Sequence, residues 1–174
     1  PDYTIPTGGT TGSPAVDPAL YNVDYAKGPI YQITKSNKSG TNWFKESTQT
    51  APITNQNLTL SGGGDNSKYL IGFNYFNQQG TVIETYVKRY TIRANTEFNI
   101  KNKVRIGENF SASIRNKNLV DGAEGIFNYM YALQSIIPVY DIKGGYGSTR
   151  GQNLGNQASP VAALKRRHDN LDFD

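Results

Sequence analysis

The 174-residue sequence contains no cysteine, one histidine and one tryptophan. Without cysteine the chain can form no disulfide, no thiolate metal site and no cysteine nucleophile. Its one histidine, His168, lies in a charged run at residues 165–169, which is typical of a solvated surface. The sequence therefore argues against hydrolase chemistry and against a histidine metal cluster. We predict no enzyme and no catalytic, metal or cofactor site, and we assign no residue to substrate binding.

Charged and apolar residues are scarce as well. Charged residues make up 18% of the chain, against about 25% in typical domains. Apolar residues make up 36%, below the roughly 45–50% of a count that also includes glycine. Asn, Gln, Ser and Thr fill the difference, together with 18 glycines and 12 tyrosines, and the net charge is +4. This composition favours β structure.

The sequence also lacks any apolar run close to the ~18 residues of a membrane helix. It begins at Pro1, and no basic-then-apolar leader follows. We therefore expect an excerpt or a processed product of a longer protein. Any contact with a membrane must be made by strands.

Residues 52–115 alternate between apolar and polar side chains, the period of a β-strand. In residues 88–101 the even positions are mainly apolar and the odd positions carry Arg89, Arg93 and Glu97. Residues 104–115 repeat this pattern, except that Glu108 falls on the apolar face, and Lys101-Asn102-Lys103 forms a polar turn between the two segments. The pattern predicts a hairpin of two long strands.

Two further alternating segments lie upstream, at residues 57–61 and 69–76, joined by a glycine-rich turn at 62–67. Together with the hairpin, these segments predict four successive strands that pair antiparallel. Strands of about a dozen residues exceed the usual 5–6 and suit the 9–11 of a tilted membrane strand. Aromatic residues at both ends of the strands match two interfacial girdles: Tyr69 and Phe98 near the tight turns, and Tyr75, Phe76 and Tyr90 opposite.

The flanking regions show no such period. Residues 1–50 are rich in Gly and Pro and predict an excursion with a short helical turn at 42–47, which contains Trp43. Residues 116–174 predict a long connection with short helices and the start of a next strand. Its features are a helical stripe ending at Pro138, a small hairpin around Lys143-Gly144 and a helix capped by Ser159; the stripe consists of Ile126, Met130, Leu133 and Ile137.

Three aromatic residues in these flanks, Trp43, Tyr129 and Tyr131, could stack on sugar rings or peptide side chains if exposed. The alternative for each is a loop packing residue or a girdle anchor. The basic run Lys165-Arg166-Arg167 accompanies no nucleic-acid recognition motif, so we expect no nucleic-acid partner.

A series of ordered motifs runs along the chain, at residues 40–44, 50–53, 57–63, 68–80, 88–95, 104–107 and 138–141. In this order they resemble the start of the barrel in SusC/RagA-like TonB-dependent outer-membrane transporters of Bacteroidetes. The similarity extends from about Pro18 to Asn170. Asn42 stands where the family usually has Asp, and Ser159 where it usually has Asn.

The resemblance implies an all-β fold: an antiparallel meander within a 22-stranded transmembrane β-barrel, with residues 1–50 and 116–174 as extracellular loops and 51–115 as wall strands. It implies active import of oligosaccharides or peptides across the bacterial outer membrane. The implied partners are a SusD-like surface lipoprotein, outer-membrane lipid, and TonB-ExbB-ExbD acting through a plug that is absent from these residues. Arg89, Arg93, Glu97, Arg105 and Arg115 would face the lumen or plug. The alternative is a soluble or secreted β-sheet carbohydrate-binding module, since alternation also describes a sheet with one wet face.

The alternation generates a test of the two faces. In the intact protein, Ile92→Arg should impair barrel assembly much more than Thr91→Arg, because an arginine facing lipid at mid-depth costs about 2–4 kcal/mol in such barrels. Assembly is measured as heat-modifiable migration of the folded barrel on electrophoresis gels. Equal effects of the two substitutions would contradict the face assignment.

Overall fold

The computed structural model describes residues 3–4, 17–101, 103–120, 123–149, 155, 157–166 and 170–173. The chain divides into two compact units. We call Thr50–Leu119 with His168–Asp174 the sheet unit, and Pro1–Gln49 with Val120–Arg167 the loop unit. The loop unit thus combines two regions that lie far apart in the sequence.

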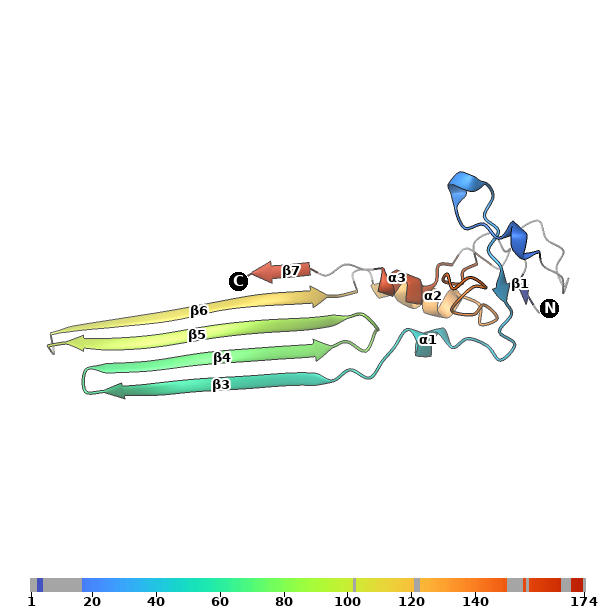
Figure 1. Cartoon of the computed structure of the whole chain (residues 1–174). Coiled ribbons are helices and arrows are strands. Elements are labelled where there is room, and N and C mark those ends of the chain that lie inside the picture. The colour runs from blue at the N-terminus through green and yellow to red at the C-terminus, as the bar shows by residue number, and fades with distance from the viewer. Residues whose placement is uncertain are drawn as a thin grey trace. The chain divides into compact units, whose positions relative to one another are not determined.

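The sheet unit contains four long antiparallel strands in chain order, β3 (Ile53–Gly64), β4 (Ser67–Gln79), β5 (Tyr86–Ile100) and β6 (Val104–Asn118) (Figure 1). A short fifth strand, β7 (Asn170–Phe173), pairs antiparallel with the end of β6. The predicted all-β meander is confirmed. The strands are 12 to 15 residues long, well above the 5–6 of ordinary soluble strands.

The glycine-rich connector differs from the prediction. Gly62, Gly63 and Gly64 are paired strand residues of β3, and only Asp65 and Asn66 form the turn. Gly62 lies directly opposite Tyr69, whose ring occupies the space that a Cβ at Gly62 would need. An aromatic side chain that covers a cross-strand glycine supplies the packing surface that the glycine lacks, so this strand continues where sequence rules predicted a loop.

The second predicted turn falls partly outside the described residues, since Asn102 is not among them. Lys101 has a φ of 49°, and the amide of Lys103 donates to the carbonyl of Ile100 at 3.0 Å, which closes the turn. The following strand β6 continues to Asn118, beyond the predicted end at Arg115.

The register of the sheet places the predicted apolar residues in common rows. One row joins Leu58, Phe73, Ile92 and Ala112, and the next joins Leu60, Ile71, Ala94 and Phe110. Glu108 stands opposite Thr96 on this face, and nothing in the structure explains it. Tyr75 and Tyr90 pack across β4 and β5 with ring centroids 5.1 Å apart. The predicted faces are therefore confirmed.

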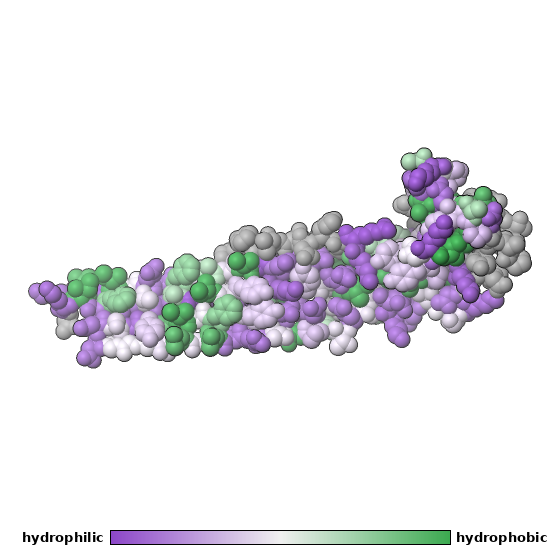
Figure 2. Space-filling model, viewed as in Figure 1, coloured by the Kyte–Doolittle hydropathy of each residue, from purple (hydrophilic) through white to green (hydrophobic). Residues whose placement is uncertain are grey.

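The apolar side chains of the sheet lie at its surface (Figure 2). Leu58 is 70% exposed, and Ile92 and Phe98 are each nearly half exposed. Among the described residues, the buried hydrophobic side chains all belong to the loop unit, and β3 to β6 contribute none. The sheet therefore presents an apolar face that its own strands do not cover.

The loop unit has a core of its own. It contains α1 (Trp43–Glu46), α2 (Ala123–Ala132), α3 (Pro160–Lys165), the 3-10 turns η1 (Pro18–Leu20) and η2 (Tyr25–Lys27), and the two-residue strands β1 (Tyr3–Thr4) and β2 (Thr34–Lys35). The core is made by Ile33, Trp43, Ile126, Met130, Leu133, Ile137, Val161, Ala162 and Leu164. No helix in the described part of the chain is long and apolar enough to span a membrane.

The predicted stripe on residues 126–137 is buried, but the helix is shorter than predicted. Helix α2 ends at Ala132, six residues before Pro138. Carbonyls beyond the helix accept bonds from the distant first segment: Gln134 from the Trp43 indole, Ser135 from the Thr41 amide and Ile136 from the Asn37 amide. These tertiary bonds replace the next helical turn.

Trp43 is 3% exposed, so the suggestion that it stacks on a ligand is wrong. Tyr131 is 78% exposed and Tyr129 is half-buried. The predicted cap at Ser159 is confirmed, since its Oγ accepts from the Ala162 amide at 3.3 Å. The structure adds a second cap, because Asn42 Oδ1 accepts from the Lys45 amide at 2.9 Å at the start of α1.

The segment at 32–36 is more ordered than its sequence indicated. Gln32, Ile33, Thr34 and Ser36 are buried, although the region shows no apolar period. Its partners lie far along the chain, since the Ile33 carbonyl accepts from the Ile142 amide at 3.1 Å. A single buried strand of this length leaves too short a pattern for period analysis to detect.

Gly147 offers a test of this packing. It is buried, its amide donates to the Val139 carbonyl at 2.9 Å, and a Cβ there would collide with the backbone oxygen of Pro138. Gly147→Ala in the full-length protein should lower the local stability of the loop unit by about 1–3 kcal/mol, measured as faster hydrogen exchange at residues 137–149.

The matched control is Gly125→Ala on α2, where a Cβ would meet nothing within 4 Å. Replacing a helical glycine by alanine stabilises by up to about 1 kcal/mol. Similar losses at both positions would show that the close approach at Gly147 is not what limits the packing.

Candidate functional site

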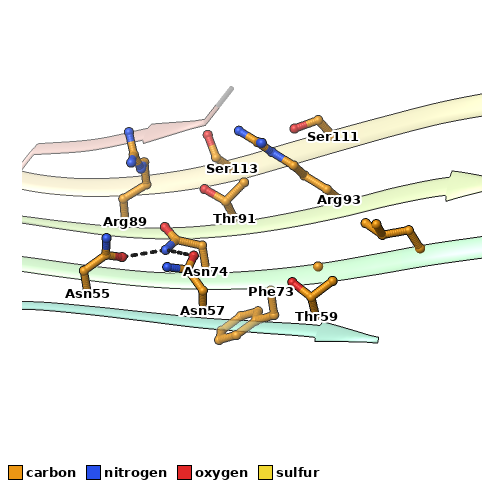
Figure 3. Close-up of a pocket in the computed structure, with 12 residues that line it drawn as sticks. Asn55, Asn57, Thr59, Phe73, Asn74, Arg89, Thr91, Arg93, Ser111 and Ser113 are labelled. Atoms are coloured by element: carbon orange, nitrogen blue, oxygen red, sulfur yellow. Dashed lines mark hydrogen bonds between the residues drawn. The ribbon is translucent and has the colours of Figure 1, made fainter. Parts of the chain in front are cut away.

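The polar face of the sheet contains a concave region of about 490 Å³, which we call the polar hollow (Figure 3). All four long strands contribute to it, and most of its lining consists of amides, hydroxyls and guanidiniums. The lining residues are Asn55, Asn57, Thr59, Leu70, Gly72, Phe73, Asn74, Arg89, Thr91, Arg93, Ser111 and Ser113. Sequence analysis placed Arg89 and Arg93 on this face but identified no hollow.

Three asparagines form one side of the polar hollow. The Asn74 amide nitrogen donates to the Oδ1 atoms of Asn55 and Asn57, each at 2.7 Å, as the dashed lines in Figure 3 show. Asn74 can reach both because Asn57 lies directly opposite it and Asn55 lies two residues earlier on β3. With their oxygens engaged, Asn55 and Asn57 keep amide N–H groups that can donate to a ligand.

The two arginines come from β5, four residues apart on the same face, with Thr91 between them. The register places Ser111 opposite Arg93 and Ser113 opposite Thr91 on β6. The Arg89 guanidinium lies 5.5 Å from the ring centroid of Phe76, a cation–π contact. Within the described part of the chain, neither arginine forms an ion pair.

A third feature of the polar face lies outside the hollow. Arg105 Nη2 donates to Glu97 Oε2 across β5 and β6, near the turn between these strands. Both side chains belong to the face that the sequence predicted for them. Charge on this part of the face is therefore compensated locally, although an exposed pair of this kind adds little stability.

In the loop unit, the carboxylate of Asp141 is a hydrogen-bond centre. It accepts from the Tyr21 hydroxyl at 2.6 Å, from Gln32 Nε2 at 2.8 Å, and from the amides of Lys143 and Gly145 at 2.9 and 2.8 Å. It therefore ties the start of the unit to the hairpin around Gly144, which has a φ of 82°. The predicted hairpin is confirmed by the bridge between Tyr140 and Tyr146.

These contacts also set two pKa values. Burial by itself raises the pKa of Asp141, but hydrogen bonds from Gln32, Tyr21 and the two amides favour the anion more strongly and hold the pKa below its usual value. Burial and the hydrogen bond to the Asp141 anion raise the pKa of Tyr21 well above its usual value. Sequence reasoning missed Asp141, although aspartate shortly before glycine in a turn is a recognised signal for side-chain-to-backbone bonds.

Comparison with known proteins adds two kinds of likeness, although no family model matches the chain. The chain is 31% identical over 145 residues to TonB-dependent receptor P3 of Formosa agariphila. The aligned region covers 78% of this chain and 14% of the receptor. It is 28% identical over 106 residues to TonB-dependent receptor P26 of the same organism, over 60% of this chain and 10% of that receptor. The chain thus spans only a small part of these relatives.

The fold is similar to part of the RagAB peptide importer in its "closed-closed" state, with a TM-score of 0.54 and 26% identity over 73% of this chain and 15% of that one. A second structure, of the RagAB peptide transporter, matches with a TM-score of 0.52 and 24% sequence identity. This match covers 71% of this chain and 15% of that chain.

The sheet therefore corresponds to a piece of a TonB-dependent receptor barrel. The resemblance to SusC/RagA-like TonB-dependent transporters, which the sequence motifs predicted, is confirmed by both the sequence relatives and the fold. The relatives are receptors and importers, not enzymes, which fits the prediction that this chain performs no catalysis.

Asp141 generates a pH prediction. Because its pKa is lower in the folded protein, its stabilising contribution is complete above the unfolded-state pKa of about 3.9 and is lost as pH falls through the lower folded-state value. Hydrogen exchange at Lys143 and Gly145 in the full-length protein, corrected for intrinsic pH dependence, should therefore accelerate below about pH 4.

Asp141→Asn should remove this pH dependence and lower the local stability by about 1–3 kcal/mol at neutral pH. Asp24→Asn, which changes an exposed carboxylate of the same unit, is the control and should leave residues 141–147 unaffected. An unchanged pH profile in Asp141→Asn would contradict the assignment.

Proposed function

We propose that this chain forms wall strands and outer loops of a TonB-dependent transporter that imports oligosaccharides or peptides across the bacterial outer membrane. The observation that carries the proposal is the uncovered apolar face on four strands of membrane-spanning length. A hydrocarbon environment would remove that face from contact with water.

The dimensions of the sheet support a membrane location. At about 3.3 Å per residue and a tilt of about 40°, the stretch of β5 from Tyr90 to Ile100 covers roughly 25 Å along the membrane normal, the height of the apolar band in outer-membrane barrels. Tyr90 and its partner Tyr75 stand at one end of this band, where an aromatic girdle is expected. Lys101 and Lys103 follow at the other end, at the level of lipid headgroups.

The opposite face suits the interior of such a barrel. Most of its side chains are polar or charged, including Arg89, Arg93 and the Glu97–Arg105 pair. In a large barrel the interior holds water or a plug, so these groups avoid the penalty of contact with lipid. Residues 51–115 would then be wall, with the polar hollow facing the lumen.

The connections between the strands are short at one end of the sheet and long at the other, as in outer-membrane barrels. β3 and β4 are joined by two residues and β5 and β6 by three, whereas the loop unit connects to the start of β3 and the end of β6. Short turns face the periplasm in such barrels and long loops face outward. We therefore assign residues 1–50 and 116–174 to the extracellular side.

The partners follow from the same proposal. The name TonB-dependent receptor supports energy transfer from TonB-ExbB-ExbD, through a plug encoded elsewhere in the full-length protein. The likeness to RagAB supports a surface lipoprotein of the SusD type as the second component and peptides as one possible cargo. A soluble carbohydrate-binding module is less consistent with the structure, since the apolar face of its sheet would need a second layer from its own chain to bury it.

Fractionation tests the proposal. The full-length gene product should sediment with outer membranes, require detergent for extraction and migrate differently on gels before and after heating, as folded barrels do. A periplasmic protein from the same cells serves as the control for lysis. A full-length product that stays folded in the aqueous phase without detergent or lipid would overturn the proposal.

A further inference from the structure

The polar face of β3 to β6 carries more positive than negative charge, and two of its cationic side chains, Arg89 and Arg93, line the polar hollow. Along β3 to β6, whose residues are all described, Glu97 is the only acidic side chain on this face. It pairs with Arg105, outside the hollow. Within β3 to β6, Arg89 and Arg93 therefore have no free carboxylate on this face, and the acidic residue that β7 adds, Asp172, stands opposite Arg115.

The register places a third arginine in the same row as Arg89. Arg115 on β6 stands directly opposite Arg89, and on its other side it stands opposite Asp172 of β7. The contact with Phe76 holds the Arg89 guanidinium by its ring face but supplies no negative charge. An anion bound beside Arg89 and Arg93 would supply the negative charge that β3 to β6 do not offer these two side chains.

The surroundings of the two arginines fit an oxygen-rich anion. Guanidinium groups bind carboxylate or sulfate through paired N–H donors. Ser111 and Thr91 add hydroxyl donors beside Arg93, and Asn55 and Asn57 offer amide N–H groups across the hollow (Figure 3). The volume of about 490 Å³ lies within the 300–1,000 Å³ of ordinary ligand sites.

We propose that the polar hollow is a binding site for a carboxylate carried by the imported ligand. Arg93 and Arg89 are its charged contacts, and the neighbouring hydroxyls and amides hold the uncharged part of the ligand. The proposal rests on the proposed function for the source of the anion, a molecule in transit. It adds a chemical class, acidic oligosaccharides or acidic peptides, to that function.

A carboxylate from another part of the same protein is the competing occupant. The lining favours an exchangeable ligand, because hydroxyls and amides accept the varied donors and acceptors of a passing molecule. A permanent internal ion pair would need only the arginines and a fixed acid. The two occupants differ in one measurable respect, the chemical accessibility of the guanidiniums in the intact transporter.

Labelling with phenylglyoxal, which modifies arginine, followed by peptide mass spectrometry tests this in the full-length protein. Without ligand, Arg89 and Arg93 should be modified. An anionic probe, oligogalacturonate or a glutamate-rich peptide, should slow their modification several-fold, whereas a malto-oligosaccharide of equal length or the glutamine version of the peptide should not. Protection by the saccharide or by the peptide identifies the source of the anion.

Three results would overturn the proposal. Arginines that resist the reagent with and without probe are paired with a carboxylate of the protein itself. Equal protection by neutral and anionic probes indicates steric shielding only. Full modification in the presence of both anionic probes shows that the hollow binds no such group.

Substitutions give an independent measurement. Arg93→Gln and Arg89→Gln should each weaken binding of a fluorescent form of the protecting probe by roughly tenfold, the usual effect of losing one charge-assisted hydrogen bond. Arg105→Gln removes the same charge from the same face outside the hollow and should change binding less than twofold. Equal effects of all three substitutions would show that the probe responds only to the net charge of the face. That result would contradict a defined binding site.

These outcomes are separable from the proposed function. Outer-membrane fractionation and heat-modifiable migration of the variants report whether the barrel forms, and neither depends on the hollow. A transporter that reaches the outer membrane but binds no anion would leave the proposed function in place and remove only this inference.

Discussion

The pairing register of β3 to β6 is the constraint on which the sheet unit depends. Successive side chains of a strand point to opposite faces, so a shift of one residue exchanges the two faces completely. Such a shift would move Ile92 to the face of the polar hollow and Arg93 to the apolar face. The aromatic pair Tyr75–Tyr90 and the packing of Tyr69 over Gly62 fix the register at two levels of the sheet.

The loop unit is held together by a different kind of interaction. Its core joins segments about a hundred residues apart, through the Asp141 carboxylate, which bonds to Tyr21 and Gln32, and the Trp43 indole, which donates to Gln134. These contacts are buried or partly buried, and they supply partners for polar groups that are shielded from water. The unit therefore has a core of its own, to which β3 to β6 contribute no buried hydrophobic side chain.

The two faces of the sheet match the two environments of a wall strand in the proposed transporter. The apolar face is exposed on strands of 12 to 15 residues, while the polar face carries arginine, asparagine and hydroxyl side chains around one hollow. Lipid would cover the first face and water and ligand the second. The excess of guanidinium groups gives the wall a charge preference that a plain water-filled surface would lack.

The sequence by itself determined what is local and repetitive: the four strands, their faces, the cap at Ser159, and the family resemblance. Alternation over a dozen residues is a strong signal because each position repeats the same information. Only the tertiary structure decided the end of α2 at Ala132, the burial of Trp43 and Gln32, and the role of Asp141, since each depends on a partner far away in the sequence. The polar hollow belongs to the same group, because strand patterns place Arg93 and Asn57 on a face, whereas register and curvature decide which of those residues share a site.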